Sequence, residues 1–317
     1  MYMRKIFLML AAIGMFGLVL APFCQAVTIS PILDSVAINP GEGVFRTMTI
    51  FNEGDEEEEY YLFAKNFSPT GEEGEVLISE EQYGLTEWIV FPARSVAVGP
   101  KESVDVDFSI NVPQNADPGG HYAAVFASTR APEDLEGVGL SSNVGMLLLV
   151  RVEGDITEDV RLLDFNTIGS KKVYNHLPVK FEYRLENRGT VHVKPEGTIK
   201  VSGLFGKDEA NANPDNSRNL PNSIRRIDAQ WSKGAVEEGG FFTDLKNEWK
   251  NFGLGYYKAN LDITYGANDQ QIVGETSFWV FPWRVMLSAL VIIIAAIILI
   301  LLYNKAVVAT ATRKKKK

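Results

Sequence analysis

The segment VDVDFSINV, residues 104–112, alternates apolar and polar side chains without interruption. Successive side chains of a β-strand point to opposite faces, so its apolar residues would face a core while Asp105 and Asp107 face water. Residues 179–186, VKFEYRLE, repeat the same period. Strands with one apolar and one polar face are typical of antiparallel sheets that cover a core on one side.

Further strands are predicted wherever β-branched and aromatic residues gather between Gly, Pro, Asn and Asp. The polar segment 206–223 predicts a surface loop, and residues 241–252 predict a loop with at most one helical turn, since they lack an apolar stripe. An almost helix-free pattern of short strands predicts an all-β protein built of immunoglobulin-like antiparallel β-sandwiches. The additional predicted strands are residues 44–51, 60–67, 121–128, 144–152, 199–204, 257–265 and 276–281.

An internal repeat indicates two such sandwiches. TMTIFNEGD around residue 50 and FEYRLENRGT around residue 185 both run from an alternating strand into Asn-x-Gly. Asn and Gly tolerate positive φ, so we expect a tight turn after each of these strands. A strand that ends in Glu-Gly-Asp marks the boundary, which predicts a first sandwich over residues 27–153 and a second over residues 154–282.

The first 26 residues have the parts of a secretory signal: two basic residues, an apolar run and a short polar end. We expect cleavage between Ala26 and Val27. A lipoprotein signal would instead lipidate Cys24, but it needs a small residue before the cysteine, and Phe23 is bulky. Since Cys24 is the only cysteine, the exported protein would mature without a disulfide.

Near the other end, residues 285–303 form an uncharged apolar run. At about 1.5 Å per residue it would span roughly 28 Å, which is close to the thickness of a bilayer's hydrocarbon core. We therefore predict a transmembrane helix over residues 283–304, a cytoplasmic basic tail over 305–317, and both sandwiches on the extracytoplasmic side. No sortase motif precedes the run. The predicted membrane-interface anchors are Trp279, Trp283 and Tyr303.

The exported portion is acidic. Eight of the 31 basic residues lie outside it, which leaves 23 basic residues against 40 acidic ones. Such a balance disfavours nucleic acid and anionic lipid headgroups as partners of the sandwich surface. Within it, the run DEEEE at residues 55–59 would form a solvated hairpin tip or, alternatively, a calcium site. Contiguous side chains on an extended segment point alternately apart, which favours the hairpin tip.

The sequence contains no recognisable catalytic motif. The three histidines are isolated, and no nucleophile elbow, zinc-protease or phosphate-loop motif occurs. The sequence thus predicts no cofactor, no metal and no enzyme; a hydrolase on a β-scaffold is the alternative. Aromatic residues are the candidate ligand-binding groups, either stacked on sugar rings or packed in a core, with core packing favoured for Trp88. They are Tyr60, Tyr61, Tyr83 and Trp88 in the first sandwich, and Phe241, Phe242 and Trp249 in the second. The last three belong to an aromatic-dense stretch with Phe252, Tyr256 and Tyr257, which either closes the second core or forms an exposed patch for a partner.

The turns of the first sandwich resemble those of the WxL-interacting protein family over about residues 28–130. The resemblance rests on VAINPGE (36–42), the Asn-x-Gly turn (52–54), Trp88 with FP (91–92), VGPKES (98–103), VP (112–113) and PGGHY (118–122). It implies a peptidoglycan-binding immunoglobulin-like domain, a second immunoglobulin-like domain that meets host or surface proteins, a transmembrane helix and a lysine-rich tail. The acidic run at 55–59 departs from a surface suited to acidic polymers.

Two functions are therefore expected. The first is a membrane-anchored surface protein that attaches to a cell-wall polymer or to another surface protein. The alternative is a structural or chaperone-like subunit of an envelope complex, whose open sheet edges pair with strands of another protein. In both, the terminal helix contacts membrane lipid, and neither involves nucleic acid.

Overall fold

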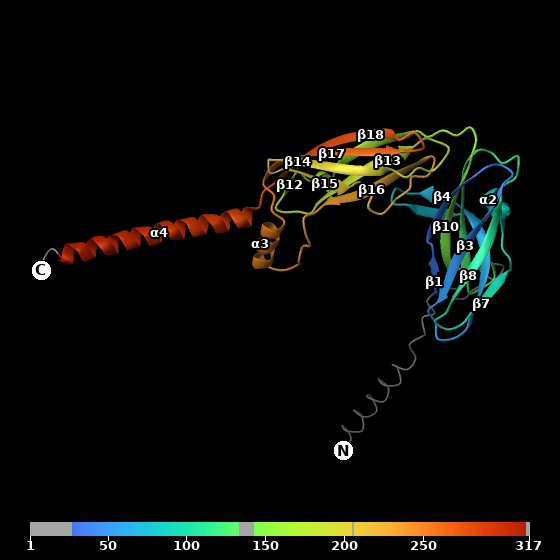
Figure 1. Cartoon of the computed structure of the whole chain (residues 1–317), viewed down its shortest axis with the longest axis horizontal. Helices are drawn as coiled ribbons and strands as arrows, with labels where there is room; N and C mark the ends of the chain where they lie inside the picture. The colour runs from blue at the N-terminus through green and yellow to red at the C-terminus, as the bar shows by residue number, and fades with distance from the viewer. Residues whose placement is uncertain (1–26, 133–142, 205, 315–317) are drawn as a thin grey trace, which may run out of the picture. The chain divides into compact units, whose positions relative to one another are not determined.

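The computed structural model describes residues 27–132, 143–204 and 206–314 (Figure 1). The predicted signal peptide, residues 1–26, lies outside the described residues, and so does the end of the basic tail, residues 315–317. The chain divides into two compact units. The first comprises Met1–Ser68 and Leu77–Asp155, and the second comprises Pro69–Val76 and Ile156–Lys317.

The first unit is a sandwich of two sheets. One sheet has the order β1 (Val27–Ser30), β3 (Gly43–Asn52), β8 (Ser103–Asn111) and β6 (Ile89–Val90). The other has the order β2 (Leu33–Ile38), β10 (Asn143–Val152), β9 (Gly119–Ser128), β4 (Glu58–Thr70) and β5 (Glu75–Ile78), with β7 (Ser95–Val98) also paired to β4. A single helical turn, α2 (Leu85–Trp88), precedes β6.

The alternating pattern of β8 sorts its side chains as expected. Its apolar residues from Val106 onward are buried between the sheets, whereas Asp105 and Asp107 are exposed. On the outer face these two carboxylates accept hydrogen bonds from the hydroxyls of Thr49 and Thr47 on β3, at 2.7 and 2.6 Å. Burial of the inner face supplies the main driving force for folding, at roughly 25 cal/mol per Å² of apolar surface.

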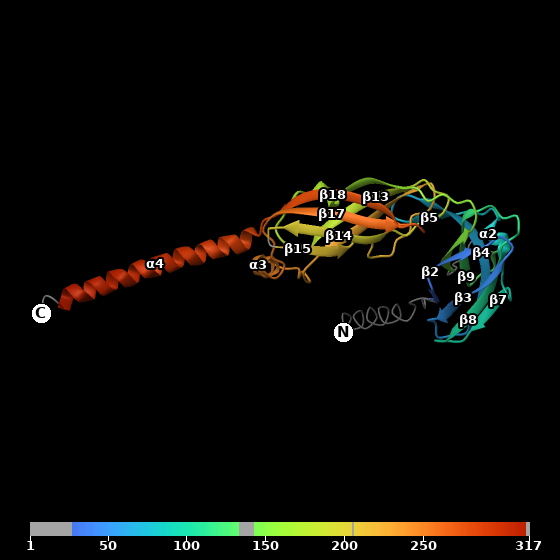
Figure 2. The same ribbon diagram turned by 45° about the horizontal axis from the view of Figure 1, so that its top comes forward.

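The second unit contains the other sandwich (Figures 1 and 2). Its three-stranded sheet has the order β11 (Val160–Thr167), β13 (Val179–Asn187) and β16 (Ser223–Trp231). Its five-stranded sheet has the order β12 (Val173–Tyr174), β18 (Gln270–Val280), β17 (Gly255–Tyr265), β14 (Glu196–Gly203) and β15 (Gly206–Asn211). A 3-10 turn (Ile168–Ser170) follows β11.

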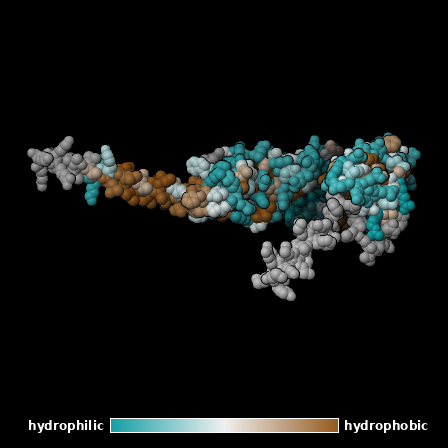
Figure 3. Space-filling model, turned by 90° about the horizontal axis from the view of Figure 1, so that it is seen from below, coloured by the Kyte–Doolittle hydropathy of each residue, from teal (hydrophilic) through white to brown (hydrophobic). Residues whose placement is uncertain are grey.

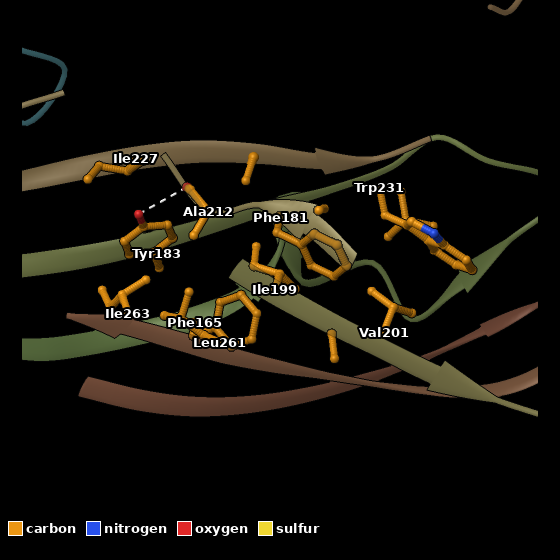
Figure 4. Close-up of a cluster of buried hydrophobic side chains, with 14 of the residues drawn as sticks. Phe165, Phe181, Tyr183, Ile199, Val201, Ala212, Ile227, Trp231, Leu261 and Ile263 are labelled. Atoms are coloured by element: carbon orange, nitrogen blue, oxygen red, sulfur yellow. Dashed lines mark hydrogen bonds between the residues drawn. The ribbon is translucent and has the colours of Figure 1, made fainter. Parts of the chain in front are cut away.

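Aromatic and branched side chains fill the core between these two sheets (Figure 4). The hydroxyl of Tyr183, in the middle of the core, donates a hydrogen bond to the carbonyl oxygen of Ala212 at 3.0 Å. Burial raises the pKa of the Tyr183 phenol, because an ionised ring would lose its hydration there. A buried hydroxyl thus keeps its proton and its partner.

The two sandwiches repeat one topology. The order β1-β3-β8 corresponds to β11-β13-β16, and β2-β10-β9-β4-β5 corresponds to β12-β18-β17-β14-β15. In each, one short strand pairs in parallel, β2 with β10 and β12 with β18, while the long pairs, such as β3 with β8 and β17 with β18, are antiparallel. The prediction of two immunoglobulin-like β-sandwiches is confirmed, with these two parallel pairs as a departure from fully antiparallel sheets.

The Asn-x-Gly repeat has a different cause from the predicted one. Neither Gly54 nor Gly189 has a positive φ. Instead, the buried carboxamide of Asn52 accepts a hydrogen bond from the Gly54 N–H at 2.8 Å, and that of Asn187 accepts one from the Gly189 N–H at 2.9 Å. Each carboxamide also donates to two backbone carbonyls. A buried side-chain turn, repeated in both sandwiches, therefore closes these strands.

Two segments predicted as loops contain regular structure. Residues 206–211 form β15, which pairs with β14 along its whole length. The rest of the predicted 206–223 loop is tied down by the buried amides of Asn213 and Asn219, which donate to backbone carbonyls at 2.9 Å. Residues 241–252 were predicted as a loop, but they contain the ten-residue helix α3 (Phe241–Lys250).

The last element is the long helix α4 (Trp283–Lys314). Its part Trp283–Ala306 is 24 residues long and includes an 18-residue stretch with a mean hydropathy of 3.4, so it is long and apolar enough to span a membrane. Figure 3 shows its hydrophobic surface. The helix begins at the predicted residue but ends ten residues beyond the predicted end at 304, because a helix satisfies its own backbone hydrogen bonds and no Gly or Pro follows to stop it.

Candidate functional site

The predicted aromatic platform of the first sandwich does not form. Tyr60 and Trp88 are buried, with 2% and 8% of their surface exposed, and Trp88 packs on His121 with 4.6 Å between the ring centroids. Burial, followed by the charge of Glu58, raises the pKa of the Tyr60 phenol. These two rings are core residues and present no open face to a sugar.

The other two rings of the predicted platform lie apart. Tyr61 follows Tyr60 on β4 and so points to the opposite face of the sheet, where its hydroxyl donates to Glu59 at 3.2 Å. Tyr83 is 58% exposed in the loop before α2, where its backbone carbonyl accepts a hydrogen bond from the Asn66 amide. The sequence favours core packing for Trp88, and Trp88 is buried, but the sequence did not separate the buried ring of Tyr60 from the rings of Tyr61 and Tyr83.

No group of three or more His, Cys, Asp or Glu side chains is placed to hold a metal ion within residues 27–132, 143–204 and 206–314. In the acidic run at residues 55–59, Asp55 forms an ion pair with Lys101 at 3.1 Å, and Glu58 and Glu59 belong to β4. The run connects β3 of one sheet to β4 of the other, so it is not the predicted hairpin tip but a link between the two sheets.

An open sheet edge lies along β8. The strand pairs with β3 over its full length, but on its other side β6 reaches only Ser109 and Ile110. In the part of the chain that the structure describes, no strand pairs with that side of β8 over residues 103–108. We call residues 103–108 the β8 edge. A row of unpaired backbone groups of this kind is a template for a further strand.

Hydrogen bonds at both ends of the β3–β8 ladder identify the open groups. The Asn52 N–H donates to the Glu102 carbonyl at 3.0 Å, and the Val112 N–H donates to the Glu42 carbonyl at 2.9 Å. In an antiparallel ladder, hydrogen-bonded pairs alternate with pairs whose N–H and C=O groups point away. The outward groups of the β8 edge are therefore those of Ser103, Asp105 and Asp107, whose side chains are also exposed.

A second feature joins α3 to the start of α4. The carboxylate of Glu248, which is fully buried, accepts hydrogen bonds from the backbone N–H groups of Arg284 and Val285 at 2.8 and 3.1 Å. The Arg284 guanidinium completes the contact through Glu248 at 3.0 Å and Asp244 at 2.7 Å. A carboxylate that receives the first N–H groups of a helix satisfies donors that have no partner inside the helix.

The aromatic residues near this joint are largely exposed. Phe242 is 82% exposed and Trp249 is 71% exposed, while Phe241 contacts Trp283 with 6.4 Å between ring centroids. Trp279 on β18 lies beside Tyr256, 5.5 Å away. Both predicted alternatives apply to parts of this aromatic stretch: Phe241, Phe242 and Trp249 are exposed, whereas Tyr257 is 4% exposed and belongs to the second core.

No protein-family profile matches this chain, and no curated protein matches it. The resemblance to the WxL-interacting protein family therefore stays a prediction.

Among solved structures, the chain is similar to the CsuC–CsuE chaperone–tip adhesion subunit complex of Acinetobacter baumannii, at 12% identity over 79% of this chain and 97% of that chain, with a TM-score of 0.36. It is also similar to a chaperone–tip adhesin complex of CFA/I fimbriae, at 12% identity over 79% of this chain and 98% of that chain, with a TM-score of 0.36. The E. coli chaperone DraB matches at 10% identity over 80% of this chain and 97% of that chain, with a TM-score of 0.34. At these identities the likeness is to the fold alone.

Proposed function

We propose that this chain is a membrane-anchored envelope protein that holds a protein partner by adding one of the partner's strands to the β8 edge. The role is one of binding and not of catalysis. The observation that carries the proposal is the unpaired backbone of Ser103, Asp105 and Asp107 on one side of β8. Strand addition uses this kind of edge: main-chain hydrogen bonds give affinity, and alternate side chains give specificity.

The edge has the chemistry of a selective acceptor. Its two outward carboxylates, Asp105 and Asp107, are held by threonine hydroxyls on β3 and are therefore ordered. Charged side chains at an edge discourage pairing with unrelated apolar strands. A partner strand with basic or hydroxyl side chains opposite these aspartates would gain charge-assisted contacts, about 0.2–1 kcal/mol for each cross-strand pair.

The helix α4 supplies the membrane anchor in this proposal. Its apolar part is 24 residues long, and Tyr303 lies 20 residues after Trp283. At a rise of about 1.5 Å per residue, the two aromatic residues are separated by roughly 30 Å, the thickness of the hydrocarbon core. The lysine-rich end of the chain favours the cytoplasmic side for the C-terminus, which leaves the sandwiches on the extracytoplasmic side.

The test is a proline at the open edge. Asp105→Pro removes an N–H that points away from β3, so the variant loses no backbone hydrogen bond of its own sheet. The tagged full-length chain would be purified from membranes, with its bound proteins identified and quantified. We expect the partner recovered with the unaltered chain to be lost from Asp105→Pro.

Asp105→Ala is the matched control, because it removes the same carboxylate but keeps the backbone N–H. It should retain the partner, while thermal unfolding followed by circular dichroism checks that both variants are folded. Equal recovery of the partner by the folded proline variant would rule out strand addition at the β8 edge. Loss of the partner from both variants would instead assign the contact to the carboxylate.

A further inference from the structure

The exposed face of α3 differs in chemistry from its inward face. Both carboxylates of the helix, Asp244 and Glu248, are turned toward Arg284. Phe242, Lys246 and Trp249 are exposed, and their spacing of four and three residues places them on one side of the helix. We call these three residues the α3 face. Exposed aromatic rings on one side of a helix, with a lysine between them, suit a membrane interface. The Lys246 ammonium is paired with the carboxylate of Glu237, in the segment before α3, at 2.8 Å.

The position of α3 is fixed relative to the start of α4. The Glu248 carboxylate binds the backbone of Arg284 and Val285, and the Phe241 ring contacts Trp283, the first residue of α4. Figure 1 shows α3 beside the point where α4 leaves the second sandwich. Since the apolar span begins at Trp283, the α3 face is continuous with the end of the segment that would enter the bilayer.

We propose that α3 is an interfacial helix whose face, Phe242, Lys246 and Trp249, lies in the headgroup layer of the lipid bilayer that α4 spans. This inference rests on the proposed anchoring by α4. The bilayer is the occupant because the face adjoins the membrane-spanning segment and exposes two rings to a degree that water does not favour, 82% and 71%. The polar ring edge of Trp249 suits the boundary between water and acyl chains, and the half-exposed ion pair of Lys246 with Glu237 would lie on the water side of that boundary.

Contact of α3 with the bilayer would restrict the orientation of the second sandwich relative to the membrane. A single helix entering a bilayer allows the domain above it to pivot. A second contact through α3, held to α4 by the buried Glu248 carboxylate, adds a fixed point beside the first. The second sandwich would then present its strands at a constant height above the lipid.

Site-directed labelling tests the inference in lipid. The only native cysteine, Cys24, is replaced in a Cys24→Ser background, and single cysteines are introduced as Phe242→Cys or Trp249→Cys, each of which leaves the other ring in place. The full-length chain carries a nitroxide at that cysteine in nanodiscs of phosphatidylcholine with phosphatidylglycerol. Relaxation by oxygen, which concentrates in lipid, is compared with relaxation by a water-soluble nickel complex.

Two further labels calibrate the measurement: Glu238→Cys, an exposed position before α3, and Leu290→Cys in the apolar part of α4. We expect the oxygen-to-nickel ratio at 242 and 249 to lie severalfold above that at 238 and below that at 290. A lipid-like ratio at 290 with water-like ratios at 242 and 249 would overturn the α3 inference and leave the anchor intact. Water-like ratios at all four positions would overturn the membrane anchor itself.

Discussion

Replacing Glu248 by alanine is expected to release α3 from the first turn of α4. The variant leaves the Arg284 guanidinium and two helix N–H groups without their buried acceptor. Removing one partner of a buried ion pair typically costs about 3–5 kcal/mol. Because Arg284 keeps its ion pair with Asp244, we expect the lower end of that range, about 3 kcal/mol. Amide hydrogen exchange in α3 should therefore accelerate on the order of a hundredfold or more, since each 1.4 kcal/mol corresponds to about a tenfold change.

The measurement is hydrogen exchange of the full-length chain in detergent micelles, read by mass spectrometry of peptides that cover α3. Glu238→Ala is the matched control, because this glutamate is exposed in the same connecting segment. Its exchange in α3 should be unchanged. Glu248→Gln keeps an acceptor oxygen but no charge, so it should fall between the two. Unchanged protection of α3 in Glu248→Ala would show that the carboxylate does not hold the joint.

The second large effect is expected for Asn187→Ala, which removes the buried turn at the end of β13. Its carboxamide satisfies the carbonyls of Val191 and Asn219 and the N–H of Gly189, at 2.9 Å each. A buried polar group that loses its partner costs about 1–3 kcal/mol, and three such groups with partial relaxation should cost about 3–5 kcal/mol. For a unit of this size that corresponds to a fall in Tm of roughly 10 °C.

Thermal unfolding of the full-length chain in detergent, followed by far-ultraviolet circular dichroism, measures this shift. Asn175→Ala is the control: this asparagine is exposed between β12 and β13, and its replacement should leave Tm within about 1–2 °C, as is usual for surface substitutions. Equal Tm values for the two variants would mean that the carboxamide contacts do not stabilise the sandwich.

The predicted strands are those whose side chains alternate between core and water. β8, β13 and β17 follow this pattern over nine or more residues, and the sequence locates them within two residues at each end. β16 escaped prediction because Arg225 and Arg226 interrupt the alternation before Ile227 and Trp231 enter the core. β15 was not predicted because only Ala210 of its six residues is buried. The strand is held by its pairing with β14 and has no apolar face that a sequence pattern could reveal.

The helix α3 was missed for a related reason. Helices are recognised by a stripe of apolar residues, but the buried residues of α3 are Asn247 and Glu248. These side chains are held by polar contacts, Asn247 with the backbone of residue 237 and Glu248 with the start of α4. These partners lie ten and 36 residues away in the sequence, so no pattern within α3 itself predicts the helix.

The candidate binding edge shows the same limit. Alternation in residues 104–112 predicts a strand with Asp105 and Asp107 on its polar face. Whether that strand lies inside a sheet or at its edge depends on where β6 leaves it, after pairing with only Ser109 and Ile110. Edge status is a property of the assembled sheet, so the open groups of β8 could be identified only in the structure.

Photo-crosslinking in intact cells that make the protein tests the central claim most directly. A photoreactive amino acid replaces Asp107 on the β8 edge or, as a comparison, Asn175 on the exposed surface of the second sandwich. Strand addition at β8 predicts one defined protein adduct from position 107 that is absent from position 175. No adduct at position 107, or the same adducts from both positions, would contradict the account.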